Sequence, residues 1–221
     1  TIALIALLSC VSTSESSKAL VRLLPAGETG VYFTNTITET EQINYFTYPY
    51  LYMGGGVGVI DVNNDGLPDL YFTANLGSNK HYLNKGNMQF EDITARAGVS
   101  GTGQWHPGVA IADLNGDGLQ DIYVSVSGKW AATENLLYIN NGDLSLTEQA
   151  KEYGLADPGH STQASFIDYD QDGDLDVYVA NYPPTPFKAP ALVYHRSIQS
   201  PDWQSSDLLY RNDSGKFSDV T

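Results

Sequence analysis

Short apolar runs broken by polar turns recur along the chain from Gly56 onward. The run Leu70–Thr73 is followed by the similar runs Ile122–Ser125 and Val177–Ala180, each directly after an acidic loop. Short apolar runs bounded by Gly and Asp residues are typical of β-strands. No window keeps a helical period for more than two turns, although Thr147–Tyr153 fits a single helical turn. The pattern predicts an all-β fold.

The strands group into units that repeat about every 50 residues, with four strands in each unit. The predicted third strands all end in Asn: His81–Asn84, Leu137–Asn140 and Leu209–Asn212. The predicted fourth strands follow a turn that contains Gly: Phe90–Thr94, Leu144–Glu148 and Phe217–Thr221. Four-stranded units at this period are typical of β-propeller blades. We place the repeats at about 53–104, 105–160 and 161–221.

An acidic loop joins the first predicted strand of each unit to the second. Side-chain oxygens stand at loop positions 1, 3, 5 and 9, and Gly at position 6 permits a sharp turn. The three sets are Asp61, Asn63, Asp65 and Asp69; Asp113, Asn115, Asp117 and Asp121; and Asp168, Asp170, Asp172 and Asp176. Ca²⁺ takes about six to eight oxygen ligands. The backbone carbonyls at position 7 would add to each set: Leu67, Leu119 and Asp174.

Two other interpretations of these loops fit less well. An EF-hand needs Glu at position 12 and flanking helices, whereas position 12 here is Phe72, Val124 or Val179 inside a strand. A plain Asp-Gly hairpin turn does not require Asp at both position 1 and position 9. The sequence therefore predicts about three Ca²⁺ ions bound in β-hairpins.

The charge of the chain agrees with bound cations and excludes one class of partner. The chain of 221 residues has 26 acidic and 11 basic side chains and a net charge of −15. Three Ca²⁺ ions would bring the charge to about −9. A nucleic-acid partner is not expected, because phosphate binding needs clustered positive charge. With one cysteine, the chain has no internal disulfide.

The first residues predict export and lipid anchoring. The apolar run Ile2–Leu8 has the length of a signal-peptide core and is too short to span a membrane. Leu7–Cys10 is similar to a bacterial lipobox, in which the cysteine receives lipid after cleavage. We interpret 1–10 as the remnant of a signal peptide and 11–19 as a Ser-rich tether, which places the domain on the outer membrane or cell surface. The alternative is a buried first strand that carries a core cysteine.

The acidic loops resemble the FG-GAP or VCBS repeat, which is found in the integrin α-chain propeller and in many bacterial secreted proteins. The segment Glu28–Asn35, the Gly54–Val57 entry and the Phe90–Thr94 ending are similar, more narrowly, to bacterial VCBS-repeat lipoproteins related to the cartilage acidic protein group. This resemblance implies a calcium-binding propeller of about seven blades. Residues 20–221 would then be three blades of a larger ring, with Leu20–Leu24 as a fourth strand that completes another blade. A three-unit protein that closes by oligomerising is the alternative.

The blade topology divides the connections between two faces. The acidic loops and the turns between third and fourth strands share one face, and the remaining connections lie on the other. All three tryptophans fall on this second face: Trp105, Trp130 and Trp203. The connection of about Asn181 to Ser206 is the longest. Because aromatic rings suit sugars and protein contacts, the three tryptophans are the predicted ligand-binding residues. Their alternative role is packing beneath the loops.

A cluster of tyrosines precedes the first complete repeat. Tyr48, Tyr50 and Tyr52 would share one face if this segment were a strand. We expect them to pack between blades rather than to bind a ligand.

The sequence favours a binding module over an enzyme. It contains no nucleophile elbow, phosphate loop or zinc-type histidine spacing, and three copies of one acidic loop are more typical of structural ions than of an active site. His106 and His160, at matching positions in two repeats, are expected to pack within loops. The predicted function is ligand binding or adhesion, to an extracellular protein or glycan. The alternative is a polysaccharide lyase or hydrolase whose active site lies in other blades.

Overall fold

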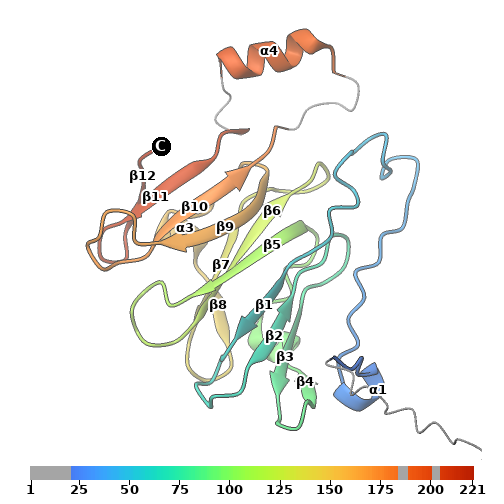
Figure 1. Ribbon diagram of the computed structural model, residues 1–221, viewed down its shortest axis with the longest axis vertical. Helices are drawn as coiled ribbons and strands as arrows, with labels where there is room; N and C mark the ends of the chain where they lie inside the picture. Colours follow the sequence, from blue (N-terminus) through green and yellow to red (C-terminus); the bar gives the residue numbers. More distant parts are fainter. Residues whose placement is uncertain (1–20, 184–188, 201–204) are drawn as a thin grey trace, which may run out of the picture.

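The strands form three antiparallel sheets of four strands each, and these are the predicted blades of a partial β-propeller (Figure 1). The computed structural model describes residues 21–183, 189–200 and 205–221. The first sheet contains β1 (Val57–Ile60), β2 (Asp69–Phe72), β3 (Lys80–Asn84) and β4 (Phe90–Asp92). The second contains β5 (Trp105–Ala112), β6 (Asp121–Ser127), β7 (Leu136–Asn140) and β8 (Leu146–Glu148). The third contains β9 (Ser161–Ile167), β10 (Asp176–Asn181), β11 (Leu208–Asn212) and β12 (Phe217–Asp219).

Two apolar cores lie between neighbouring sheets, and the side-chain alternation of β5 explains how the middle sheet serves both. Val109 and Ile111 pack in the core shared with the first sheet. Ala110 and Ala112 pack against the core shared with the third sheet. Successive side chains of a strand point to opposite faces, so a strand of the middle sheet is apolar at consecutive positions.

The outermost faces of the first and third sheets leave apolar side chains exposed. Val57 and Val59 of β1 are each 58% exposed, and Ile167 of β9 is 51% exposed. Val57 and Val59 occupy the positions in their repeat that Val109 and Ile111 occupy in the next. Blades on either side, as the predicted seven-bladed ring has them, would cover these side chains in the way that the first sheet covers β5.

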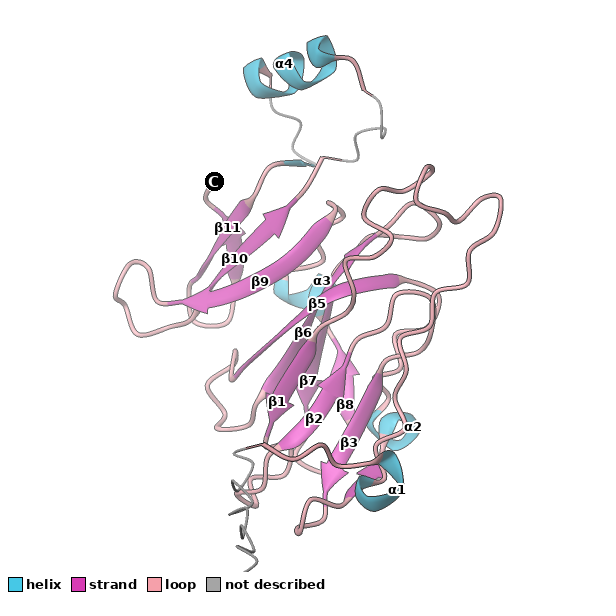
Figure 2. Cartoon of the chain, turned by 45° about the vertical axis from the view of Figure 1, so that its right-hand side comes forward, coloured by secondary structure: helices cyan, strands magenta, loops and turns pink. Residues whose placement is uncertain are grey.

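A helical turn accompanies each sheet (Figure 2). The turns are α1 (Ala26–Thr29), α2 (Thr94–Ala97) and α3 (Ala150–Tyr153), and α3 lies within the predicted turn Thr147–Tyr153. Each ends at a glycine with φ between 76° and 79°. A Cβ on Gly30 would lie 2.4 Å from the carbonyl oxygen of Phe90 in β4, and one on Gly154 would lie 3.1 Å from that of Phe217 in β12. Only glycine therefore fits both the left-handed backbone and the close approach to the neighbouring sheet.

Residues 21–25 have no regular structure, so the expected strand Leu20–Leu24, which was to complete a further blade, stays a prediction. The chain beyond it does follow the repeat, since α1 and Gly30 lie against the first sheet. Gly98, after α2, likewise faces the second sheet, where a Cβ would lie 3.5 Å from the carbonyl oxygen of Leu146. A strand at 20–24 would have to pair with a blade, and the described sheets offer it none.

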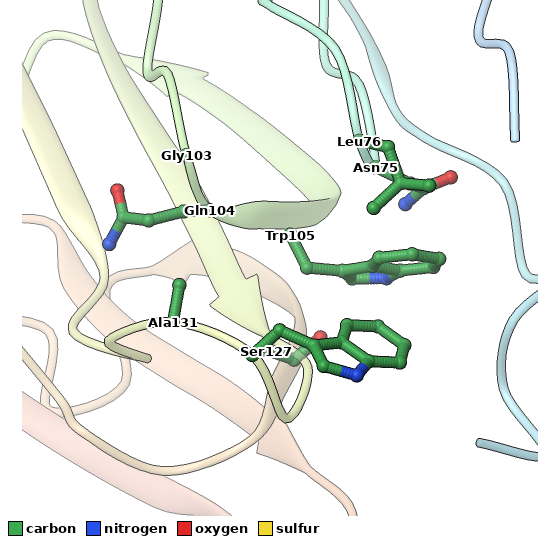
Figure 3. Close-up of a pocket in the computed structure, with 8 residues that line it drawn as sticks. Asn75, Leu76, Gly103, Gln104, Trp105, Ser127 and Ala131 are labelled. Atoms are coloured by element: carbon green, nitrogen blue, oxygen red, sulfur yellow. The ribbon is translucent and has the colours of Figure 1, made fainter. Parts of the chain in front are cut away.

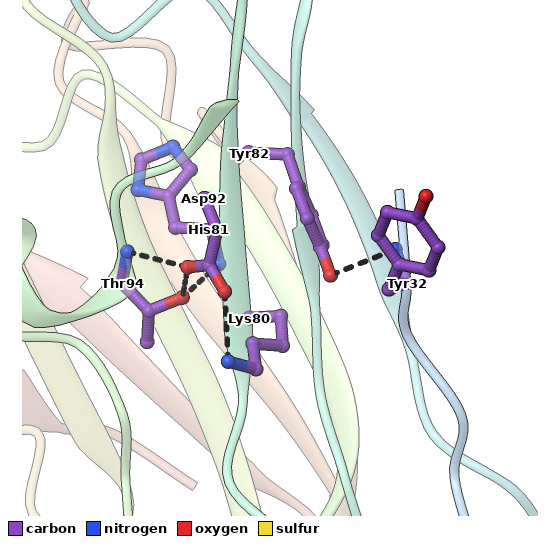
Figure 4. Close-up of polar contacts among 6 residues, drawn as sticks. All are labelled: Tyr32, Lys80, His81, Tyr82, Asp92 and Thr94. Atoms are coloured by element: carbon purple, nitrogen blue, oxygen red, sulfur yellow. Dashed lines mark hydrogen bonds and ion pairs between the residues drawn. The ribbon is translucent and has the colours of Figure 1, made fainter. Parts of the chain in front are cut away.

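A carboxylate at the end of the fourth strand binds the turn that follows it, as Asp92 of β4 shows (Figure 4). Asp92 accepts the backbone N–H of Thr94 at 3.0 Å and pairs with Lys80 at 2.8 Å. Thr94 Oγ1 in turn accepts the N–H of His81 at 2.9 Å. Next to it, the Tyr82 hydroxyl accepts the N–H of Tyr32 at 3.2 Å, which ties the N-terminal segment to β3.

The tyrosine segment is not a strand. Residues 41–53 form bends and turns, with Tyr48 2% exposed and Tyr52 63% exposed. The prediction that the tyrosines share a strand face is therefore wrong. Tyr48 instead packs with Leu51, Trp105 and Tyr182, because these turns cross the ends of the blades and bury the ring there.

The longest predicted connection contains a helix that the sequence analysis missed. This helix is α4 (Ala191–Gln199), which is nine residues long. Its short length and the prolines before it hid the helical period in the sequence. No helix in the described ranges is both long enough and apolar enough to cross a membrane.

Candidate functional site

The acidic loops connect the first and second strands of each sheet, where the sequence predicted them. They lie at 61–68, 113–120 and 168–175. The turns between third and fourth strands lie at the same end, since Asp174 accepts the N–H of Ser214 at 2.8 Å. A Cβ on Gly142 would come within 3.3 Å of Leu119. One face of the arc of blades thus carries all three loops.

The aspartate at position 1 shapes each loop from inside. Asp61 accepts the N–H groups of Asp65 and Gly66, at 3.0 and 2.8 Å. Asp113 accepts those of Gly116, Asp117 and Gly118. These bonds curl the backbone around the first carboxylate, which brings positions 3 and 5 to the same side of the loop.

The aspartate at position 9 is fully buried in all three repeats and joins two strands. Asp69 accepts the N–H of Val62 at 2.9 Å and that of Asn84 at 2.6 Å. Asp121 and Asp176 repeat the same pair of bonds: with Leu114 and Asn140, and with Tyr169 and Asn212. Each carboxylate therefore fixes the loop to the end of the third strand, a structural role that the sequence analysis missed.

The asparagine that ends each third strand completes this arrangement. Its side chain donates to a backbone carbonyl just before the position-9 aspartate, from Asn84 to Pro68 at 2.9 Å and from Asn212 to Leu175 at 3.1 Å. Its carbonyl oxygen accepts the N–H of the turn glycine, as Asn140 does from Gly142 at 3.0 Å. The recurring Asn at the strand end was the sequence signal for this contact.

Burial raises the pKa of the Asp121 carboxyl to about 6, despite the two backbone N–H donors, and the nearby Asp117 and Asp113 act in the same direction. Burial also raises the pKa of Asp69. A charge held in such surroundings is unfavourable unless it is compensated. A cation at the loop would supply that compensation.

The third loop brings the carboxylates closest together. One oxygen from each of Asp168, Asp170 and Asp176 lies within 4.8 Å of the other two. Oxygens that share one Ca²⁺ at about 2.3–2.6 Å lie at most about 5 Å apart. Oδ1 of Asp168 is also buried and has no hydrogen-bond partner. These residues fit a Ca²⁺ ion, which would be the missing partner of that oxygen.

The first and second loops differ from the third at position 3. Asn63 and Asn115 donate from their amide nitrogens to Asp65 and Asp117, both at 3.0 Å. Asp170 has no amide nitrogen and cannot donate in this way. Loss of solvent around its carboxyl and the nearby carboxylates of Asp172 and Asp176 raise its pKa. The third loop therefore has four carboxylates at positions 1, 3, 5 and 9, whereas each of the other two loops has three.

Two of the predicted tryptophans, Trp105 and Trp130, lie at the opposite end of the blades. Trp105 begins β5, and the acidic loop begins at Asp113, so about 23 Å of strand separates them. Trp105 is only 3% exposed and belongs to the core with Tyr48 and Tyr182. The N-terminal turns cover its ring, which is the packing role that the sequence analysis left open, and its part in ligand binding stays a prediction. Trp130 is 37% exposed, whereas Trp203 and Cys10 lie outside the described residues.

The histidine of the second repeat is a core residue. His106 lies in β5 rather than in a loop and is fully buried, as is His81 in β3. Burial lowers the pKa of both imidazoles to about 4. Both rings are neutral at physiological pH.

Comparison with known proteins places the acidic loops in a defined family of repeats. The sequence pattern of the FG-GAP-like repeat matches residues 61–124 and 126–179. Cartilage acidic protein 1 of Xenopus tropicalis is 34% identical over 134 residues, which cover 59% of this chain. Integrin alpha-8 of Mus musculus is 28% identical over 191 residues, which cover 77% of this chain. The chain spans about a fifth of the length of these curated relatives.

Proposed function

The chain belongs to the FG-GAP-like repeat family, and from this premise we propose that it is a calcium-binding propeller module that binds an extracellular protein or glycan. The acidic loops form one end of the module and hold the ions. The opposite end, with Trp130, meets the partner. The module acts by binding rather than by catalysis.

The convergence of three carboxylates in the third loop is the observation that carries the calcium assignment. The same set of loop positions occurs in all three repeats. Bound Ca²⁺ would neutralise these carboxylates and stiffen the hairpin. The ligands proposed are the side chains at positions 1, 3, 5 and 9 and the carbonyls of Leu67, Leu119 and Asp174.

The relatives support the binding role. Of the two proteins reported above, one is named as an integrin and the other as an acidic protein of cartilage. These names support a module that works outside the cytoplasm. We further propose that a lipid attached to Cys10 holds the module at the outer membrane or cell surface.

Titration of Ca²⁺ into the metal-free chain is expected to show three ions per chain. Asp117→Ala should remove one of them, because it takes a carboxylate from the second loop alone, and the other two sites should keep their affinities within about threefold. Calorimetry measures the number of ions bound per chain and the affinity of the sites. Asp143→Ala, which lies outside the acidic loops, is the matched control. A chain that binds no Ca²⁺, or an Asp117→Ala variant that still binds three ions, would contradict the assignment.

Replacing Cys10 by Ser is expected to release the protein, expressed with a complete bacterial signal peptide, from the membrane fraction. The acyl chains on this cysteine would be the anchor, and stable attachment takes two or more of them. Fractionation and immunoblotting compare the variant with Ser9→Ala, which keeps the cysteine. Equal membrane association of the two variants would rule out the lipid anchor.

A further inference from the structure

Two histidines are enclosed in the junction between the first and second sheets. His81 of β3 and His106 of β5 are both fully buried. The ring of His81 packs edge-on against Tyr71 of the shared core, with ring centroids 5.7 Å apart. None of the four nitrogens of the two rings has a hydrogen-bond partner. A charge on either ring would therefore be buried without compensation, which is strongly unfavourable.

The ring of His106 lies where backbone groups of the two sheets meet. The backbone N–H of His106 donates to the carbonyl of Ala74, in the connection after β2, at 3.2 Å. A Cβ on Gly101 would lie 2.8 Å from Cε1 of the His106 ring and 2.6 Å from Nδ2 of Asn79. Because the ring is packed this closely, a protonated ring gains water only if the two sheets separate.

The junction borders solvent at the end where His106 lies. A pocket of about 110 Å³ is formed there by the connection after β2, the start of β5 and the connection after β6 (Figure 3). Its lining includes Asn75 and Trp105, which adjoin Ala74 and His106 in the chain. Solvent in the pocket is therefore one residue away from the hydrogen bond that joins the sheets, and separation of the sheets can begin at this point.

Protonation of the two rings is linked to separation of the sheets. Burial lowers the pKa of both imidazoles from the ordinary 6.5 to about 4, whereas a ring released to water regains the ordinary value. Between these two values the open state binds a proton and the closed state does not, so acid favours the open state. The closed junction is fully favoured above about pH 6.5, and this advantage is lost as the pH falls towards 4.

The groups that face the rings do not remove this effect. Asp92 of β4 raises the pKa of His81, but less than burial lowers it, and Asp92 is paired with Lys80. Tyr71 of β2 stays uncharged, because burial raises its pKa. In the part of the chain that the structure describes, no charged side chain shifts the pKa of His106, and the carbonyl of Ala74 offsets the effect of burial only in part.

The other two histidines of the chain have different surroundings. His160, at the second junction, is partly exposed, and its ring contacts Tyr182. Burial and Lys129 lower the pKa of His160, whereas Asp157 raises it. Its partial exposure lets water reach the ring without separation of the sheets. His195 of α4 is exposed and lies outside the sheets.

We propose that His81 and His106 make the first blade junction an acid-sensitive joint, which opens as the pH falls below about 6. Opening separates Asn75 from Trp105 and takes apart the pocket between them. The inference goes beyond the proposed function, and it depends neither on bound Ca²⁺ nor on a ligand.

Urea unfolding of the metal-free chain at pH 8 and at pH 5.5 tests the effect of the two rings. Each ring should raise the unfolding equilibrium constant by about tenfold between these pH values, and both rings together by about a hundredfold. His81→Leu introduces the residue of the next repeat, where Leu137 is fully buried. His106→Gln keeps a side chain that does not titrate. Each variant should lose about tenfold of the pH dependence, and the double variant about a hundredfold.

The matched control is His195→Gln, which should keep the pH dependence of the unchanged chain within about twofold. Groups that the chain and its variants share, such as the Asp121 carboxyl, cancel in this comparison. Unfolding curves at pH 8 check that each variant folds. Each single variant is a sufficient test, since each is expected to lose about tenfold by itself.

Hydrogen exchange locates the opening. The backbone N–H of His106 bonds across the junction, so its protection reports the joint. Between pH 8 and pH 5.5, this protection should fall about a hundredfold more in the unchanged chain than in the double variant. The amides of β10 should keep more protection than His106 at pH 5.5, because the third sheet stays folded when the joint opens.

Two results would overturn the inference. The first is a double variant that keeps the pH dependence of the unchanged chain, which would show that neither ring acts in this way. The second is equal protection of His106 and β10 at pH 5.5, which would show that acid unfolds the whole chain rather than the joint. Because both measurements are made without metal, they leave the calcium titration as a separate test of the proposed function.

Discussion

Removal of divalent cations is expected to lower the thermal unfolding midpoint of the chain by about 15 °C or more. A ligand that binds only the folded state at 100 times its dissociation constant stabilises that state by about 2.7 kcal/mol. Three such sites give about 8 kcal/mol, and in a chain of this size each kcal/mol corresponds to about 2–4 °C. Calorimetry in excess CaCl₂ and in excess EDTA measures the difference.

The structure indicates where this stabilisation acts. The third loop holds the oxygens of three aspartates within 4.8 Å of one another, and without a cation we expect repulsion between them to loosen the hairpin. Asp117→Ala should keep about two thirds of the shift, because two of the three loops are unchanged. Superimposable melting curves with and without EDTA would refute the calcium assignment.

Asp121→Ala is expected to destabilise the metal-free chain by about 3–5 kcal/mol. The substitution leaves the buried N–H groups of Leu114 and Asn140 without an acceptor, and each such loss costs about 1–3 kcal/mol. It also frees the loop from the end of β7. Urea unfolding without metal, at about pH 5 where this carboxyl with its raised pKa is mostly protonated, measures the loss of the two acceptors apart from metal binding and from the unfavourable buried charge.

Two comparisons make the Asp121 experiment specific. Asp121→Asn keeps one acceptor oxygen and should lose about half as much stability. Asp117→Ala removes an exposed carboxylate that accepts from Leu119 and Asn115, and should change the metal-free stability by less than about 1 kcal/mol. An equal loss in Asp121→Ala and Asp117→Ala would show that position 9 has no structural role of its own.

The fold could be predicted because its signals are local and repeated. Strands β2, β6 and β10 were expected at Leu70–Thr73, Ile122–Ser125 and Val177–Ala180, and in the structure their ends differ from these by at most two residues. The fourth strands were expected to run further, to Thr94 and Thr221. They end at Asp92 and Asp219 because these carboxylates accept the N–H two residues later, which turns the chain out of the sheet.

The candidate site could be predicted in part. The spacing of the acidic side chains indicated which residues face one another within a loop, since all of them lie within nine residues. Spacing could not show that Asp69 contacts Asn84, because the two are brought together only by the pairing of β2 with β3. The same limit applies to Trp105, whose burial depends on Tyr48, more than 50 residues earlier.

The sequence by itself determined the all-β blades, their order, the position of the acidic loops and the end of the blades on which Trp105 and Trp130 lie. These features follow from strand alternation and turn residues, which act over a few positions and recur in every repeat. Only the tertiary structure decided that position 9 is buried and bound to the third strand, that residues 41–53 fold over Trp105, and that Trp105 keeps an unpaired N–H beside a pocket. Those outcomes depend on which side chains fill the spaces between sheets, and packing between distant segments has no counterpart in local sequence pattern.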